Sequence, residues 1–460
     1  MATRTAPRVR ASARAPRLRS RPDAATVRLV LIGLALALLA GAALPVVVRD
    51  LPSDVVRLLP IGVVVLIGAT YLAFARPAVL VVGGFALLGF VRFEPAPVDL
   101  VFALLMVTSL LAGRVHPQLP VVVAVPLALL AALTILSAMN ATDAARAARF
   151  ELITLYLMAL AVWLTSVFRD RGVTRLALKA YVLAGAATAV VSAVALEIGF
   201  PGGDVLLFDE FRAEGLFKDP NVFGPFLVPA AAIVLEDLVR PRLFGWRRSA
   251  LVVVFLSLLA GILVAYSRAA WLNLAIALGT IILVYAWRRG GFGAALKAVA
   301  VLALAGAAGI ALLVATGSLT FLEERSGIQL YDADRFRTQS SALSRMTELV
   351  FGHGPGQVET TLDYAAHSLY LRVGFEQGVL GAVLILVLLA VTAGLALILA
   401  ARDGDIAGVG GAALLGSWLG LIANSVVVDT LHWRHLWLVA ALIWAGYASL
   451  SATRAERPPG

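Results

Sequence analysis

The chain has 460 residues, of which 61% are hydrophobic and 14% are charged, and it contains no cysteine. Soluble domains carry about a quarter charged residues, so the composition excludes an ordinary globular protein, and the lack of thiols excludes disulfides and thiolate metal sites. The net charge of +10 requires no nucleic-acid partner, because a basic tail beside a first apolar segment is typical of a membrane-orientation signal.

The N-terminal tail, residues 1–28, contains eight arginines. This composition predicts a disordered cytoplasmic tail, and residues 452–460 are predicted to form a second one. A signal peptide is the other interpretation of this end, but the leader would be too long and many more apolar segments follow it. We therefore expect a single integral membrane domain over residues 29–451.

Apolar stretches repeat between the tails, and most are long enough to cross a bilayer as a helix, which takes about 17–25 residues. Because backbone groups in lipid must be satisfied within the segment, helices are predicted. The predicted segments are 29–48, 57–75, 78–92, 98–113, 120–138, 149–168, 176–198, 221–239, 249–266, 269–287, 294–316, 378–400, 407–427 and 435–451. The third and fourth are short and form either two spans or one re-entrant pair. The expected fold is an all-α polytopic bundle of about 12–14 transmembrane helices.

Basic residues predict the orientation of this bundle, because they gather on the cytoplasmic side. A cytoplasmic N-terminus places three basic clusters inside. These clusters are Arg169, Arg171, Arg175 and Lys179; Arg240, Arg242, Arg247 and Arg248; and Arg288 and Arg289. Both termini are then cytoplasmic, and two long polar loops, about residues 199–220 and 317–367, lie outside.

The outer loops carry more arginine than this rule predicts. They contain Arg212, Arg325, Arg335, Arg337 and Arg345. Positive charge held against the orientation bias indicates an anionic ligand at the membrane surface. The competing interpretation is interfacial anchoring by arginine side chains that extend to water.

The first outer loop includes FRAEGLFKDPNVFGPF, residues 211–226. Arg212 and Lys218 supply positive charge, and the sequence Asp-Pro-Asn predicts a turn that opens the next helix, with Asn221 as a candidate N-cap. An ordinary anchoring loop would have the same composition, so the spacing alone does not distinguish a ligand-binding loop from an anchoring loop.

A second candidate is Ser267–Arg268, at the outer end of another span. Ser267 is predicted to cap the helix, whose N-terminus favours an anion. Arg268 would add bidentate donors for phosphate oxygens. An arginine that only extends to the interface is the alternative.

The long outer loop holds the third candidate. Residues 335–349 predict a short amphipathic helix that lies on the membrane surface, and FGHGPG ends it. Ser368 is predicted to cap the helix that leads into the next span. Arg372 and Glu376 lie one helical turn apart, so they are predicted to pair.

His367 lies between the polar loop and that helix, and histidine exchanges protons near neutral pH. A lone interfacial histidine more often packs or caps, and His353 in the glycine-rich turn competes for the same role. His432 and His435 are predicted to be interface anchors. No histidine pair has HExxH spacing, so no metal site is predicted; the acidic pair of Asp332–Ala333–Asp334 is the one weak alternative.

Four segments occur in a characteristic order within roughly residues 205–400: RAEGLFKDPN, SRAAWLNLAIAL, RFRTQSSAL with FGHGPG, and HSLYLRVGFEQGVLG. Together they resemble the O-antigen ligase and O-antigen polymerase superfamily of bacterial membrane glycosyltransferases. One position departs from the family, which commonly has asparagine after the loop histidine where this chain has Ser368.

The resemblance implies a GT-C type helical fold in the bacterial cytoplasmic membrane, with short helices on a long extracytoplasmic loop and an outward-facing active site. It implies inverting, metal-independent transfer, without a cofactor, of a glycan from a polyprenyl-pyrophosphate donor. The acceptor would be a hydroxyl of a glycan, lipid or cell-wall component. By matching positions, the resemblance implies that Arg212, Arg268 and Arg337 bind the pyrophosphate and that His367 lies nearest the reacting hydroxyl. Together with the polar segments described above, this predicts His367, Arg337 and Arg268 as catalytic residues and Arg212, Lys218, Asn221, Arg335, Arg345 and Glu376 as substrate-binding residues.

Two alternatives stay open. A polymerase of lipid-linked repeat units would differ from a ligase only in its acceptor. A transporter or flippase of lipid-linked saccharides would place ionisable groups near the middle of the membrane. The predicted spans here are nearly free of charge, which favours surface chemistry. We expect Arg212, Arg268, Arg337 and His367 to converge on one cavity at the external lip.

Overall fold

The computed structural model describes residues 53–315 and 330–455. Within these ranges the regular secondary structure is helical apart from two short antiparallel hairpins, which confirms the all-α prediction. The predicted tail 1–28 and the predicted segment 29–48 lie outside the described residues. By its internal contacts the chain divides into two units, Met1–Pro77 with Val107–Arg114 and Ala78–Met106 with Val115–Gly460. All of the candidate site residues belong to the second unit.

Each predicted segment from 57–75 onward falls on a helix. The helices are α2 (Ser53–Ala75), α3 (Pro77–Leu87), α4 (Pro97–Leu111), α5 (Val121–Ser137), α6 (Ala144–Val167), α7 (Arg171–Glu197), α8 (Pro220–Val239), α9 (Arg248–Val264), α10 (Arg268–Ala315), α12 (Leu330–Arg345), α13 (Val358–Leu362), α14 (Leu369–Ala401), α15 (Gly411–Asn424) and α16 (Arg434–Ala455). Among the described residues, seven helices are long and apolar enough to cross a membrane, and five shorter apolar helices accompany them. The protein is therefore a multi-pass membrane protein, and the number of crossings stays a prediction.

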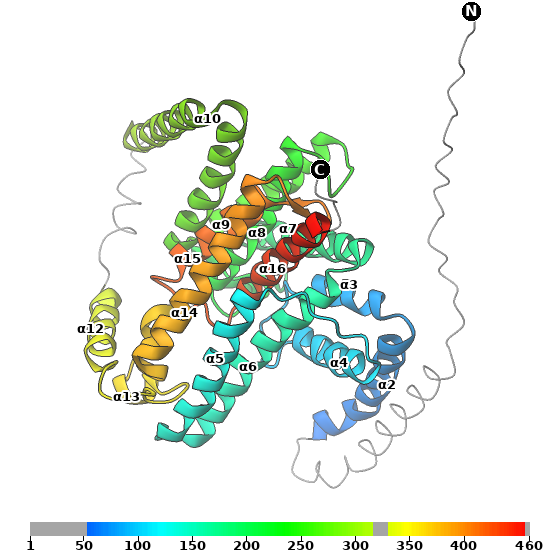
Figure 1. Ribbon diagram of the computed structural model, residues 1–460, viewed down its shortest axis with the longest axis vertical. Helices are drawn as coiled ribbons and strands as arrows, with labels where there is room; N and C mark the ends of the chain where they lie inside the picture. The colour runs from blue at the N-terminus through cyan, green and yellow to red at the C-terminus, as the bar shows by residue number, and fades with distance from the viewer. Residues whose placement is uncertain (1–52, 316–329, 456–460) are drawn as a thin grey trace, which may run out of the picture. The chain divides into compact units, whose positions relative to one another are not determined.

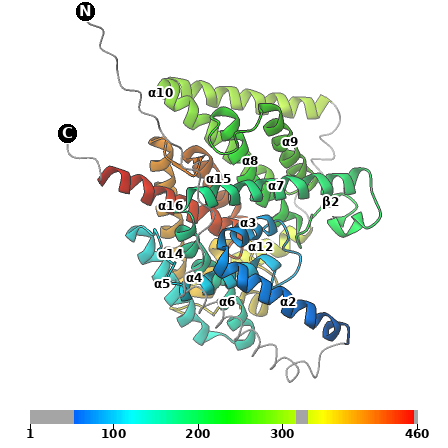
Figure 2. The same ribbon diagram turned by 90° about the vertical axis from the view of Figure 1, so that its right-hand side faces the viewer.

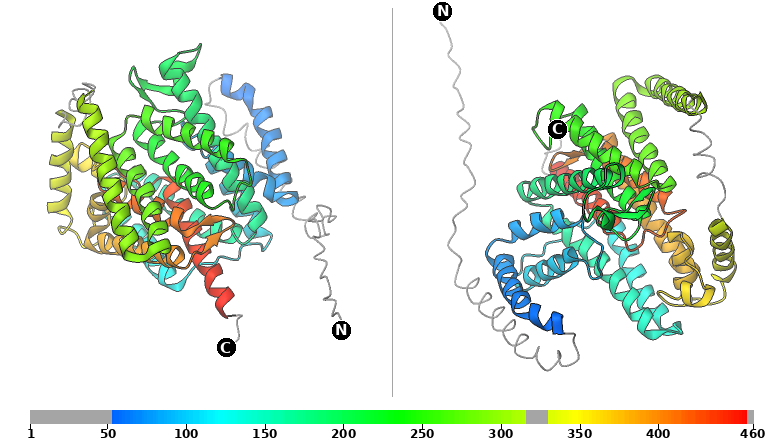
Figure 3. Two further views of the ribbon diagram at one scale, coloured as in Figure 1. Left: turned by 90° about the horizontal axis from the view of Figure 1, so that it is seen from above. Right: turned by 180° about the vertical axis from the view of Figure 1, so that it is seen from behind.

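Helices α7, α8 and α9 lie side by side (Figure 2), and α8 also packs on α10. A Cβ atom at Gly224 of α8 would come 2.8 Å from the Cβ of Ala270, so the glycine permits the close approach of α8 and α10. Further along, α10 bends at Gly290 and Gly291, where the two predicted segments 269–287 and 294–316 meet (Figures 1 and 3). Gly291 has φ +62° and ψ −152°, a backbone conformation that essentially only glycine adopts.

A second bend lies in α14 at Gly378, whose φ is +71°. Just before it, the carbonyl oxygens of Phe375 and Glu376 accept the N–H groups of His353 and Gly354, at 3.0 and 2.9 Å. These bonds satisfy carbonyl groups where the helical pattern is interrupted. The imidazole of His353 also stacks on the Phe375 ring, with centroids 4.1 Å apart. The FGHGPG turn therefore docks on the bend of α14, and His353 serves that packing.

Polar contacts gather at both ends of the helices. At the end predicted to be cytoplasmic, Asp403 pairs with Arg240, with Arg242 at 3.0 Å and with Arg288 at 2.8 Å. At the opposite end, the loop before α4 reaches the first outer loop, where Arg92 pairs with Glu214 at 2.7 Å. Loops that the charge pattern assigns to one side of the membrane thus contact one another.

The predicted pair of Arg372 and Glu376 is present, with 2.7 Å between Nη1 and Oε1. Both side chains are almost fully buried, and Arg372 also pairs with Glu359 of α13 and with Asp429. Figure 1 shows α12 and α13 beside the first half of α14. This buried cluster therefore joins α13, α14 and the loop before α16.

Replacing Arg372 with alanine is expected to lower the free energy of unfolding by about 3–5 kcal/mol, because the remaining buried carboxylates lose their cation. Arg171, whose pair with Asp405 leaves its side chain 60% exposed, provides the control, and Arg171→Ala should cost about 0–1 kcal/mol. Unfolding of both variants in detergent micelles measures the difference. Equal losses would show that the buried cluster contributes no special stability.

Candidate functional site

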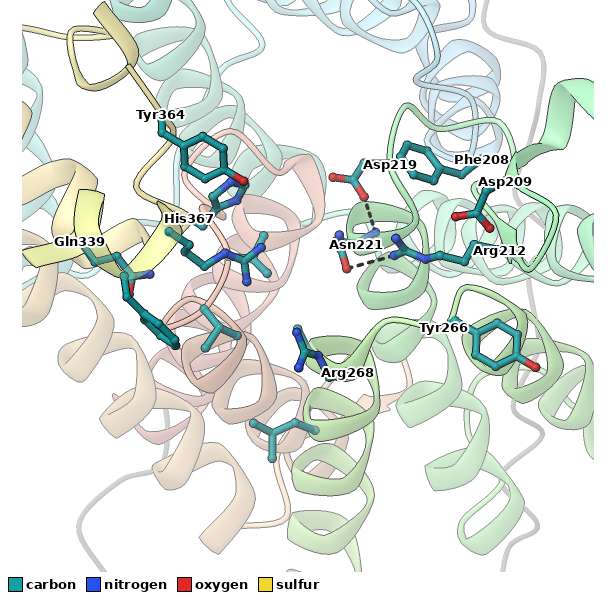
Figure 4. A pocket seen from close by; sticks show the side chains of 16 residues that line it. Phe208, Asp209, Arg212, Asp219, Asn221, Tyr266, Arg268, Gln339, Tyr364 and His367 are labelled. Atoms are coloured by element: carbon teal, nitrogen blue, oxygen red, sulfur yellow. Dashed lines mark hydrogen bonds between the residues drawn. The ribbon is translucent and has the colours of Figure 1, made fainter. Parts of the chain in front are cut away.

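A cavity of about 730 Å³ lies where the first outer loop, the start of α10, α12 and the loop before α14 meet. Its lining residues are Phe208, Asp209, Arg212, Asp219, Asn221, Tyr266, Arg268, Ala269, Leu272, Arg335, Phe336, Gln339, Tyr364, His367, Val427 and Val428. Figure 4 shows Arg268 projecting from the start of α10 between Arg212 and Asn221 on one side and Gln339 and His367 on the other. Segments far apart in the sequence thus bring several cationic side chains to one place.

The first outer loop holds Arg212 on a small hairpin that the sequence did not predict. A 3-10 turn (Gly203–Leu206) leads into strands β1 (Leu207–Asp209) and β2 (Arg212–Ala213), which pair antiparallel. The guanidinium of Arg212 lies over the Phe208 ring, 5.4 Å from its centroid, and its Nε donates to the carbonyl of Ala265 at 3.4 Å. The aromatic face and the carbonyl together orient this arginine toward the cavity.

The first residues of α8 and α10 meet at the cavity. The predicted N-cap of α8 is wrong, whereas that of α10 is confirmed. Asp219, and not Asn221, is the N-cap of α8: its carboxylate accepts the N–H of Asn221 at 2.7 Å. The amide oxygen of Asn221 instead accepts the Ser267 hydroxyl at 2.9 Å. Ser267 caps α10 as predicted, since its Oγ accepts the N–H of Ala270 at 3.3 Å. Because proline at the first helical position supplies the fixed φ that a helix start needs, the Asp-Pro pair favours aspartate as the cap.

Two residues at the cavity have left-handed backbone conformations that are uncommon outside glycine. Tyr266 has φ +45° and His367 has φ +47°, and each directly precedes the serine at the start of a helix. Ser368 occupies the predicted N-cap position of α14, although its side chain makes no capping hydrogen bond within the part of the chain that the structure describes. Non-glycine residues held in this region often mark functional sites.

His367 is partly buried and lies next to Tyr364, with 5.4 Å between the ring centroids. The side chain of Gln339 on α12 donates to the carbonyl of Ala366 at 3.0 Å, which ties α12 to the segment that carries the histidine. Burial, followed by the positive charge of Arg335, lowers the pKa of His367 below its ordinary value, and Asp219 acts in the opposite direction. The imidazole is therefore neutral at pH 7 and able to accept a proton.

Contrary to the expectation, Arg337 does not line the cavity. Its side chain is 79% exposed and pairs with Asp334 at 3.4 Å. Among the described residues of α12, the cavity is lined by Arg335, Phe336 and Gln339. Successive helical residues turn by about 100°, so Arg335 and Arg337 point to nearly opposite sides, and only one of them can face the cavity.

Three further predicted residues lie elsewhere, outside the lining of this cavity. Lys218 pairs with Glu94 at 2.9 Å, and Arg345 pairs with Glu348 at 3.0 Å. Glu376 is 2% exposed and belongs to the buried cluster around Arg372. These placements remove the three side chains from direct contact with a ligand in the cavity.

Several lining residues had no motif to identify them, including Asp209, Gln339 and Tyr364. Asp209 lies at the end of the unpredicted β1, and the other two depend on how α12 and the following loop fold back toward α14. One signal was available: Gln339 lies one helical turn after Arg335 and therefore shares its face. In residues 53–315 and 330–455, no group of three or more His, Asp or Glu side chains is arranged to hold a metal ion.

The fold and the cavity define a multi-pass helical membrane protein with a pocket whose charged lining consists of three arginines and two aspartates beside a histidine. Residues 252–386 match the family described as O-antigen ligase, which confirms the predicted resemblance to the O-antigen ligase and polymerase superfamily. The match indicates a membrane glycosyltransferase-type enzyme. It includes Arg268, Arg335 and His367, whereas Arg212 precedes it. No curated protein matches the chain.

Proposed function

We propose that the protein transfers a glycan from a polyprenyl-diphosphate donor to an acceptor hydroxyl at the outer face of the cytoplasmic membrane, in the manner of an O-antigen ligase. One observation carries the proposal: Arg212, Arg268, Arg335 and His367 line a single cavity of about 730 Å³. Three of these four residues lie within the family match. A diphosphate needs cationic donors, and the transfer needs a proton acceptor beside them.

In this proposal the arginines hold the diphosphate of the donor. Guanidinium groups bind phosphate oxygens through paired N–H donors. Arg268 and Arg335 approach from α10 and α12, and Arg212 supports them from the hairpin. When the bond between the anomeric carbon and the diphosphate oxygen breaks, its electron pair stays on the diphosphate. The arginines stabilise that growing negative charge in the transition state.

His367 is assigned the role of the base that accepts the proton of the acceptor hydroxyl. The acceptor hydroxyl attacks the anomeric carbon, and its proton passes to the neutral imidazole, which later releases it to water. The products are the new glycosidic bond and free polyprenyl diphosphate. Because the hydroxyl attacks directly, opposite the leaving diphosphate, the anomeric configuration inverts.

Reconstitution in liposomes tests this proposal directly. With a polyprenyl-diphosphate glycan and a candidate acceptor, the protein is expected to form product with inverted configuration, and Arg268→Ala should remove the activity. A growing lipid-linked chain as the preferred acceptor would indicate a polymerase, and a different lipid or wall acceptor would indicate a ligase. Because the arginines supply the positive charge, transfer should continue in excess EDTA. Loss of transfer in EDTA, restored by a divalent cation, would contradict metal independence and revive Asp332 and Asp334 as ligands.

The low pKa of His367 predicts a specific pH dependence. Transfer needs the neutral imidazole, so kcat/KM should fall as the pH drops through the pKa of His367, which lies below the ordinary histidine value. Arg335→Gln removes a positive charge that opposes protonation, so the pKa should rise and the acidic limb should move to higher pH. Arg335→Lys keeps the charge and should leave the limb in place. Profiles of kcat/KM against pH measure both, and identical limbs in the two variants would contradict the assignment.

A further inference from the structure

A second cavity, of about 1030 Å³, lies among the loop before α4 and the outer ends of α4, α6 and α16. Its polar lining residues are Glu94, Asp99, Arg146, Arg149, Tyr156, His432 and Arg434. By the predicted orientation this cavity opens on the same side of the membrane as the first. None of its lining residues belongs to the predicted catalytic or substrate-binding residues.

Four charged groups of this second cavity are matched in pairs, and a fifth, Arg146, pairs with Glu359 outside the lining at 3.1 Å. Arg434 contacts both carboxylate oxygens of Asp99, with Nε at 2.7 Å from Oδ1, and the hydroxyl of Tyr156 donates to the same carboxylate at 3.2 Å. At the rim, Arg149 pairs with Glu94 at 2.8 Å. Paired guanidinium and carboxylate groups offer strong donors and strong acceptors together, which suits hydroxyl groups that both give and accept hydrogen bonds. This lining fits a neutral saccharide better than a diphosphate.

The remaining wall of the second cavity is apolar. Leu100, Ala103, Leu152, Ile153 and Leu157 continue from the polar end along α4 and α6. Leu100 is 60% exposed and Leu152 is 68% exposed. On helices of membrane-spanning composition, such exposed side chains face lipid. The cavity therefore has a polar outer end and an apolar wall that borders the hydrocarbon. This distribution of polarity matches that of an amphipathic ligand.

A short segment separates the two cavities. Val428 lines the first and His432 lines the second, and four residues span at most about 14 Å when fully extended. Within this segment Asp429 pairs with Arg372, whose guanidinium lies 5.5 Å from the centroid of Phe150 in the second cavity. A saccharide of a few sugar residues that is bound in the second cavity is thus long enough to reach His367.

We propose that the second cavity is the acceptor site and binds the saccharide head of a lipid-linked acceptor. The saccharide hydroxyl groups contact the pairs of Arg434 with Asp99 and Arg149 with Glu94, and the lipid chain lies against the apolar side chains of α4 and α6. The free end of the acceptor then crosses the segment 427–434 and presents its hydroxyl to His367. This inference rests on the proposed transferase function and adds the place where a lipid-linked acceptor binds.

Photolabelling tests the site without any reaction. The probe is a decyl disaccharide with a diazirine on its sugar and no phosphate, added to the full chain in phospholipid nanodiscs. Labelling is expected on peptides of α4 and α6, and Ala148→Trp, which fills the cavity from an exposed position on α6, should reduce it to background. Ala250→Trp, at an exposed alanine of α9, is the matched control and should leave labelling intact. Unchanged labelling in Ala148→Trp would overturn the site, and so would displacement of the probe by phospholipid but not by free disaccharide.

Kinetics then separate this proposal from the proposed function. Arg149→Ala should raise the KM for a lipid-linked acceptor by roughly tenfold or more and leave the KM for the donor unchanged. Arg248→Ala, an exposed arginine at the start of α9, should change neither. An unchanged acceptor KM in Arg149→Ala would overturn the acceptor site. If instead Arg268→Ala kept full transfer while the second cavity still bound the disaccharide probe, the proposed donor site would fail and the saccharide site would stand.

Discussion

Replacing Arg335 with alanine is expected to slow glycan transfer by about 10²–10³-fold, whereas Arg337→Ala should leave it close to the wild-type rate. Arg335 lines the cavity beside His367, while Arg337 points to the opposite side of α12 and is 79% exposed. Because the two residues have the same chemistry and lie two positions apart, each serves as the control for the other. Differences in expression or membrane insertion between the two variants should be small.

The measurement is the initial rate of product formation in liposomes, with the amount of folded protein matched between the two variants. Arg335→Lys adds a second comparison, because lysine keeps the charge but loses the planar, bidentate fork. A rate between those of the wild type and Arg335→Ala is expected. Should Arg337→Ala be the slow variant and Arg335→Ala the normal one, the position of α12 in the structure would not represent the working state. The resemblance-based assignment to Arg337 would then be restored.

Arg335 and Arg337 also show how much of the site can be predicted from the sequence. Composition and spacing predicted an amphipathic helix in this loop and arginines on the outer side. Which arginine faces inward depends on the rotation of α12 about its axis, and that rotation is fixed by contacts with distant segments. One such contact joins Gln339 to the carbonyl of Ala366. No local pattern in residues 330–345 contains this information.

Helix boundaries were predictable for a simpler physical reason. A bilayer imposes the same length and the same backbone requirement on every span, so each apolar stretch predicts its own helix. Hydropathy places the start of this span at 378 because polar residues occupy the first turns of α14, whereas the helix start at Leu369 was predicted from the capping position of Ser368. Those turns hold Arg372 and Glu376, which are buried because Glu359 and Asp429 neutralise the arginine. Such pairing between distant segments is invisible to hydropathy.

The hairpin that carries Arg212 marks a different limit. Its strands contain only three and two residues, too few for an alternating pattern to stand out from a loop. The arginine itself was identified because its charge opposed the orientation rule. The presence of a candidate arginine in this loop was therefore predictable from the sequence, whereas the hairpin that positions it was not.

His367→Asn is expected to reduce transfer by about 10²–10⁴-fold while membrane insertion and donor binding persist. Asparagine is the informative replacement because His367 has φ +47°, and asparagine tolerates this left-handed conformation better than alanine does. The variant therefore keeps the backbone of the loop and removes only the proton acceptor. An amide has no basic nitrogen, so no pH in the working range should restore the lost rate.

Donor binding provides the second readout for this variant. Because the arginines hold the diphosphate, the affinity of His367→Asn for a polyprenyl-diphosphate glycan should match that of the wild type, whereas Arg268→Ala should bind the donor weakly. His353→Asn is the control for loss of a loop imidazole: His353 stacks on Phe375 near the bend of α14, so its replacement should affect thermal stability more than the rate per folded molecule. Full transfer by His367→Asn would end the assignment of a base to this histidine. The arginine-lined cavity would then act by binding and charge stabilisation alone, with the acceptor hydroxyl losing its proton to water.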